Sequence, residues 1–170
     1  MPKFVKINVE DSRLYDNGRV CEDVTQVALP TLEFPTTDIS VSGTAMDISI
    51  PNHARIGATT FGVTHNNGEN CQYLNSPGIH NIEFRTVRQK YSVGKTVIEH
   101  ESVKYRLKGM ISSIDNNAVE NGNPLGTTVT YQMLGFERIV AGKVDMQVDF
   151  ASNKLVINGV STTDDIQRLL

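Results

Sequence analysis

The sequence predicts a mainly β fold, a β-sandwich or barrel subunit with one short helix. Three observations carry this prediction: turn signals recur at short intervals, apolar and polar residues alternate between them, and helical periodicity is scarce. Hydrophobic residues make up 39% and charged residues 21% of the 170 positions, the composition of an ordinary folded protein. No linker or internal repeat divides the chain, so we expect a single domain over residues 1–170.

Asn-Gly pairs mark several of the expected turns. Both residues of such a pair tolerate a positive φ, which the tight turns between antiparallel strands require. The pairs are Asn17-Gly18, Asn67-Gly68, Asn121-Gly122 and Asn158-Gly159.

Alternation with a period of two predicts the strands of the second half. Residues Val103–Ile111 place apolar side chains on one face and basic ones on the other. The β-branched and aromatic stretch Thr127–Val140 leads through Ala141 and Gly142 into the alternating stretch Lys143–Phe150. We expect these two stretches to form a long hairpin. Because a Cβ at positive φ costs energy, Ala141 favours a bulged turn over a type I′ turn.

The segment 37–50 changes the face of its apolar residues. A regular strand cannot switch faces, so the pattern predicts a bulge or bend near Gly43. A strand of this kind would meet two different surfaces, which a ring of subunits provides more naturally than a monomer. The apolar residues are Ile39 and Val41 at odd positions, then Ile48 and Ile50 at even ones.

Two short helical segments are expected. Residues Glu69–Leu74 have room for one or two turns between turn signals. Near the C-terminus, Ser161 and Asp164 resemble a capping box, and they precede Ile166 and Leu169. The apolar end of this second helix needs a surface to cover it.

The sequence shows no pattern of catalytic residues, no metal-binding motif and no cofactor-binding motif. The histidines, at positions 53, 65, 80 and 100, lack the spacing that places two metal ligands on one element. There is no nucleophile elbow, and neither Cys21 nor Cys71 has a histidine nearby in sequence. We therefore expect no enzyme and no cofactor, although a metal site assembled from distant strands stays open.

A basic row on one strand has two interpretations. Lys104, Arg106 and Lys108 share one face of the strand Val103–Ile111 and could bind nucleic acid. The chain carries a net charge of −3, however, and lacks an aromatic residue on that face. Ion pairing with the acidic face of the hairpin, which holds Asp145 and Asp149, is the favoured interpretation.

Membrane and redox signals are weak. Every apolar run is broken well before the ~20 residues that a membrane helix needs, and the N-terminus lacks the pattern of a signal peptide. We expect no membrane anchor. Cys21 and Cys71 are interpreted as two free buried thiols, while one disulfide between them stays possible.

Short motifs follow one another in a fixed order along nearly the whole chain. They are Tyr-Asp-Asn-Gly at 15–18, Val-Thr-Gln-Val-Ala-Leu-Pro-Thr-Leu at 24–32, the long segment Glu33–Asn52, the strand near 58–64, the basic-striped strand 103–111, the hairpin at 141–142, and Asn-Gly-Val at 158–160. In order and length the chain resembles the major tail tube protein of contractile-tailed phages and phage-tail-like bacteriocins.

The resemblance implies a subunit that assembles into a hexameric ring, in which hairpins from all copies join one continuous inner β-barrel. Rings stack into a hollow tube inside a contractile sheath, for DNA passage or envelope puncture. Its implied partners are further copies of itself, the tail sheath protein, the tape measure protein in the lumen and, in a phage, DNA. The implied location is a virion tail or bacteriocin particle assembled in the bacterial cytoplasm.

Candidate residues follow from this interpretation. A ring of six copies at −3 each carries −18, and a lumen wall of the same sign would repel DNA phosphates and let DNA slide through without sticking. Asp145 and Asp149 are the candidates for the lumen face. Candidate contacts between subunits or rings are Phe34, Ile39, Val41, Ile48, Ile50, Ile166 and Leu169. A related secretion-tube ring protein and a ligand-binding β-sandwich module are the alternatives.

Overall fold

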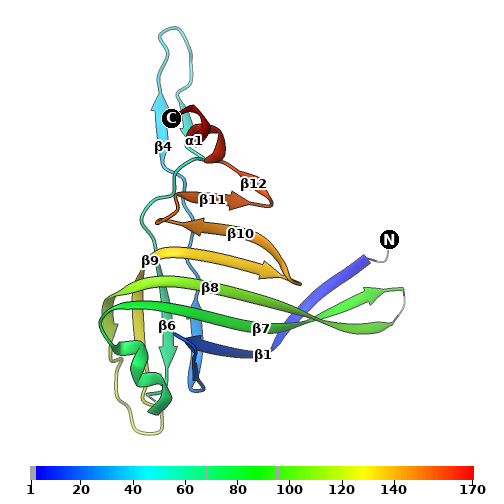
Figure 1. Ribbon diagram of the computed structural model, residues 1–170, viewed down its shortest axis with the longest axis vertical. Coiled ribbons are helices and arrows are strands. Elements are labelled where there is room, and N and C mark those ends of the chain that lie inside the picture. The colour runs from blue at the N-terminus through cyan, green and yellow to red at the C-terminus, as the bar shows by residue number, and fades with distance from the viewer. Residues whose placement is uncertain (1–2, 68, 95) are drawn as a thin grey trace.

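The computed structural model describes residues 3–67, 69–94 and 96–170 and is mainly β, as the alternation predicts (Figure 1). In chain order the elements are β1 (Lys3–Asp16), β2 (Arg19–Cys21), β3 (Val24–Ala28), β4 (Thr36–Ile39), β5 (Ile48–Pro51), β6 (Thr60–His65), the 3₁₀ helix η1 (Glu69–Asn75), β7 (Ile79–Val93), β8 (Val97–Asp115), β9 (Thr127–Val140), β10 (Lys143–Asp149), β11 (Lys154–Ile157), β12 (Val160–Ser161) and the helix α1 (Asp164–Leu169).

One large antiparallel sheet organises the molecule. Its strand order is β12-β11-β10-β9-β8-β7-β1-β2, so neighbours along the chain are mostly neighbours in the sheet. The long strands β7, β8 and β9 form its centre, and β6 pairs with the first half of β9 while β3 pairs with β6. This placement folds β3 and β6, together with η1, against one face of the central strands (Figure 1).

The core lies between the central strands and the layer formed by β6 and η1. Ile82 on β7 and Leu107 on β8 are buried in one cluster with Phe61 of β6 and Leu74 of η1. Tyr131 of β9 joins the layers, because its ring stacks on Phe61 at 5.0 Å and its hydroxyl donates a hydrogen bond to the Leu74 carbonyl at 2.6 Å. The opposite face of the central strands is therefore left to charged side chains.

Two of the predicted Asn-Gly turns are confirmed as tight turns between paired strands. Asn121-Gly122 is not one of them, because it lies in the loop between β8 and β9 and only Gly122 of the pair has a positive φ, of 93°. Asn17 and Gly18 join β1 to β2 with both φ positive, and Asn158 and Gly159 do the same for β11 and β12. Gly68 lies outside the described residues.

The long hairpin of β9 and β10 is also confirmed, but its expected bulged turn is wrong. Val140 pairs directly with Lys143, and Ala141 and Gly142 have φ of 49° and 80°. The connection is thus a two-residue turn whose geometry matches the strand twist well enough to hold a Cβ at positive φ. The irregularity lies further on, between Val144 and Met146.

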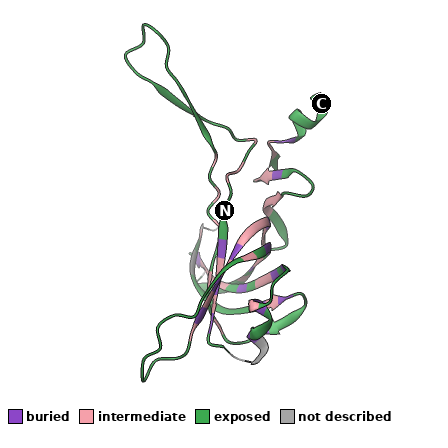
Figure 2. Cartoon of the chain, turned by 90° about the vertical axis from the view of Figure 1, so that its left-hand side faces the viewer, coloured by how far each residue is buried: buried purple, intermediate pink, exposed green. Residues whose placement is uncertain are grey.

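The segment 37–50 is a projecting hairpin, not one strand with a bulge. Strands β4 and β5 pair antiparallel, with Ile39 opposite Ile48 and Thr37 opposite Ile50. Since residues directly opposite share a face, odd positions on β4 face the same side as even positions on β5. The change of parity therefore comes from the reversal of the chain, which runs through Gly43 at φ 94°. Figure 2 shows this hairpin extending from the body of the molecule with exposed residues throughout.

Both expected helical segments are present. Residues Glu69–Asn75 form η1. Before α1 the Ser161 Oγ accepts a hydrogen bond from the Asp164 amide at 3.2 Å, but the expected capping box is wrong, because the N-cap is Thr163 and its side chain makes no capping hydrogen bond. Of the helices in the described part of the chain, none has the length and apolar character needed to span a membrane.

Candidate functional site

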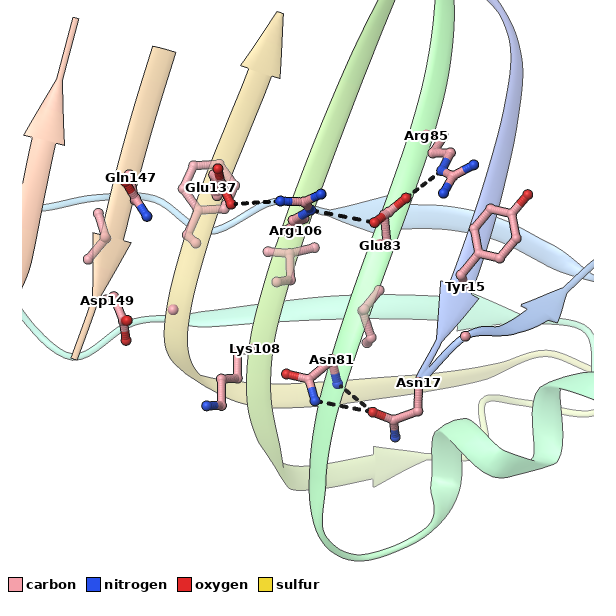
Figure 3. A pocket seen from close by; sticks show the side chains of 16 residues that line it. Tyr15, Asn17, Asn81, Glu83, Arg85, Arg106, Lys108, Glu137, Gln147 and Asp149 are labelled. Carbon is pink, nitrogen blue, oxygen red and sulfur yellow. Dashed lines mark hydrogen bonds and ion pairs between the residues drawn. The ribbon is translucent and has the colours of Figure 1, made fainter. Parts of the chain in front are cut away.

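The charged face of the sheet is the first candidate surface (Figure 3). It is formed by side chains that point away from the core, because neighbouring residues on a strand face opposite sides. These side chains line a shallow cavity of about 770 Å³ across β1, β7, β8, β9 and β10. By the charged face we mean Tyr15, Glu83, Arg85, Arg106, Lys108, Glu137, Gln147 and Asp149.

Glu83 is the centre of an ion-pair network on this face. Its carboxylate contacts Arg85, and it lies 3.5 Å from the Arg106 Nε and 3.8 Å from the Lys104 Nζ. Arg106 in turn reaches the Glu137 carboxylate at 3.4 Å from its Nη1 (Figure 3). The favoured interpretation of the basic row as an ion-pairing row is confirmed for Lys104 and Arg106, but the expected partners Asp145 and Asp149 are wrong. The sheet register places Glu83 and Glu137 directly beside Arg106.

The same contacts act on the protonation of Glu83. Burial alone would raise the pKa of its carboxyl group, but the hydrogen bond from Arg85 and the charges of Lys104, Arg85 and Arg106 together hold that pKa below its usual range. Glu83 therefore stays ionised at neutral pH, and it neutralises in part the charges of Arg85, Lys104 and Arg106. The result is a surface of mixed charge.

Asp145 and Asp149 lie on opposite faces of the sheet. The irregularity between Val144 and Met146 turns Asp145 toward Arg138, with which it forms an ion pair. Arg138 is next to Glu137 on β9, so it points to the other side. Asp149 stays on the charged face, where its carboxylate also accepts hydrogen bonds from the Ala151 amide at 3.0 Å and the Ser152 hydroxyl at 2.9 Å. The expectation that both acids share one face is wrong, because the bulge shifts the alternation by one residue.

The β4–β5 hairpin carries the second candidate surface. Ile39, Ile48 and Ile50 point to one side of it, with exposed fractions of 42%, 55% and 48%. Val41 is exposed near the tip. Phe34 lies at the base, where its ring meets the His53 ring edge-on at 5.1 Å. We call Ile39, Ile48 and Ile50 the hairpin apolar face.

The C-terminal helix is the third candidate surface. No residue of α1 is buried, and Ile166 and Leu169 expose 47% and 84% of their surface. Two further apolar features are not predicted from the sequence. One is Phe150, which follows β10 and is 83% exposed. The other is a row of Val5, Tyr91 and Ile98, which the register places side by side on β1, β7 and β8. Such a row is invisible without knowledge of strand pairing.

In the part of the chain that the structure describes, no group of three or more His, Cys, Asp or Glu side chains could hold a metal ion. What stands out are the three surfaces: a charged sheet face, a projecting apolar hairpin and an exposed C-terminal helix.

A search of curated proteins finds no match. A family model described as phage tail tube protein FII matches residues 8–170, which is almost the whole chain. The chain therefore belongs to the phage tail tube protein FII family.

Proposed function

We propose that this protein is the subunit of an inner tail tube in which hexameric rings stack inside a contractile sheath and leave a channel for DNA or envelope puncture. The family gives the chain a structural role, with self-association into a tube in a virion tail. The proposal adds the ring size, the sheath, the tape measure protein in the lumen, and assembly in the host cytoplasm. The observation that carries it is the hairpin apolar face, which projects from the body and whose three Ile residues are 42–55% exposed.

The hairpin apolar face is suited to contact a neighbouring copy. Each Ile that leaves water in an interface contributes about 1.5–3 kcal/mol when fully buried. The face and the body are different surfaces of one chain, so a contact between them is heterologous, and contacts of this kind form rings or open stacks. We therefore assign Ile39, Ile48 and Ile50, with Val41 and Phe34 at the ends of the segment, to contacts between subunits or rings.

This assignment predicts opposite results for neighbouring residues on β5. Ile48→Asp puts a carboxylate into the proposed contact. Because removing this charge from water is costly in every copy, the yield of tubes should fall at least about tenfold. Ser49→Asp puts the same charge on the other side of the hairpin and should leave the yield unchanged. Tube yield is counted by negative-stain electron microscopy of the purified protein, at equal concentrations.

Thermal unfolding of the unassembled protein serves as the control for both variants. Because both positions are exposed on a projecting hairpin, each variant should melt within roughly 2 °C of the parent protein. Normal tubes from Ile48→Asp, or an equal loss with Ser49→Asp, would contradict the assignment.

The C-terminal helix is proposed as a second contact with a neighbouring copy. Ile166 and Leu169 lie on a helix that buries none of its residues, and they expose 47% and 84% of their surface. Docking on an adjacent subunit would remove these side chains from water. Burial of exposed apolar side chains is also the reason for assigning the hairpin apolar face to a contact.

We assign the charged face to the lumen. It is hollowed, it lies opposite the core, and two of its cations, Arg85 and Arg106, are paired with Glu83 and Glu137, which weakens their attraction for DNA phosphates. Asp149 belongs to this face, whereas Asp145 does not.

Gln147 offers the cleanest test of the lumen assignment, because it lies on the charged face without a role in the ion pairs or the turn. Gln147→Lys adds six positive charges to each proposed ring and should slow DNA ejection from particles of normal length. Gln147→Glu adds six negative charges at the same place and should not slow it. Equal ejection kinetics for the two variants would count against a lumen position.

A further inference from the structure

Two thiols from distant parts of the chain meet in the core. Cys21 is the last residue of β2 and Cys71 lies in η1, and their exposed fractions are 2% and 0%. Both belong to one hydrophobic cluster, and β2 and η1 are in contact. A second contact holds the two elements together, since the Arg19 guanidinium of β2 lies 4.1 Å from the centre of the Tyr73 ring of η1.

The two thiol groups act directly on one another. Burial, the charges of Cys71 and Asp16, and the hydrogen bond with Cys71 together raise the pKa of the Cys21 thiol to about 12. Burial also raises the pKa of Cys71, while the hydrogen bond with Cys21 lowers it. The thiolate is the reactive form in disulfide chemistry. A pair held side by side but almost fully protonated at neutral pH reacts slowly.

We propose that Cys21 and Cys71 are the site of a slow disulfide that closes after the protein leaves a reducing compartment. The two thiols lose two protons and two electrons to molecular oxygen, which becomes hydrogen peroxide as the S–S bond forms. The setting rests on the proposed function, because a particle that assembles in the cytoplasm and acts outside the cell passes from a reducing to an oxidising environment.

The bond would lock the base of the hairpin. It would close the loop from residue 21 to residue 71, which contains β3, the β4–β5 hairpin and β6. A covalent link across a loop of this length stabilises chiefly by restricting the unfolded chain. Slow closure leaves the subunit free to adjust during assembly and makes the finished tube more resistant to unfolding.

The experiment exposes the purified, folded chain to oxidised glutathione at pH 7 and pH 8 without denaturant. The first thiol displaces one glutathione, and the second thiol then displaces the other, which leaves an intramolecular disulfide and two reduced glutathiones. Intact mass should fall by about 2 Da, and the rate should rise about tenfold between the two pH values. The oxidised protein should melt roughly 10 °C higher than the reduced protein.

Cys21→Ala and Cys71→Ala are the matched controls and should show neither the mass loss nor the rise in melting temperature. Two free thiols after prolonged exposure, glutathione adducts alone, disulfide-linked dimers alone, or closure only in denaturant would each overturn the proposal. The readout does not depend on tubes. Failure of the chain to form tubes with the disulfide intact would contradict the proposed function and leave the disulfide standing.

Discussion

Replacing His80 with leucine should destabilise the protein by about 3–5 kcal/mol, because it leaves a buried carboxylate without its partner. The His80 Nδ1 lies 2.9 Å from the Asp16 Oδ2, and both side chains are at least 95% buried. On the other side of the ring, Nε2 donates to the Ser76 carbonyl at 2.6 Å. His80 thus ties the end of β1 to the segment that follows η1. The second oxygen of Asp16, Oδ1, is buried and has no hydrogen-bond partner among the described residues.

Chemical denaturation followed by circular dichroism measures this loss, and a second substitution separates its cause. Adding Asp16→Asn to His80→Leu removes the stranded charge and should recover part of the lost stability. If the double variant is less stable than His80→Leu alone, then the unpaired carboxylate is not the source of the effect. The expected shift in melting temperature for His80→Leu is roughly 10 °C.

Gly109→Ala should cost about 3 kcal/mol or more, since the new methyl group has no room. A Cβ at this position would lie 2.7 Å from the Gln132 carbonyl oxygen and 2.8 Å from the Phe61 ring. The first of these atoms is backbone, and the ring is stacked in the core against Tyr131, so neither can move cheaply. The strand is irregular at this place, where the pairing of β8 with β9 shifts between Lys108 and Gly109.

Gly62→Ala is the matched control for Gly109→Ala. It also lies in a strand of the same sheet, but its Cβ would meet its nearest atoms at 3.6 Å and 3.7 Å, which is ordinary contact. We expect its free energy of unfolding to stay within about 1 kcal/mol of the parent protein. Similar losses for the two variants would show that glycine is needed for the flexibility of the strand and not for close packing.

Much of the fold follows from local signals. The hairpin of β9 and β10 is predicted within one residue, because a long β-branched run, a Gly-containing turn and a clear alternation all point to the same structure. Asn17-Gly18 and Asn158-Gly159 are confirmed as turns because their backbone preference is a property of the residues themselves. The type of turn at Ala141 is mispredicted, since the pairing of the flanking strands outweighs the small cost of its Cβ.

The candidate surfaces depended on information that is not local. Glu83 as the partner of Arg106, and Asp145 as the partner of Arg138, follow from strand register and a bulge. The change from odd to even positions marks the apolar residues at 39, 48 and 50 as unusual in the sequence. It does not show that reversal of the chain brings them onto one face. By itself, then, the sequence determined the β class, the main turns and the family resemblance, because each depends on neighbours along the chain. It also identified apolar residues that need a contact surface. Only the tertiary structure decided which faces those residues share, because one residue of shift in register turns every following side chain to the other side of the sheet.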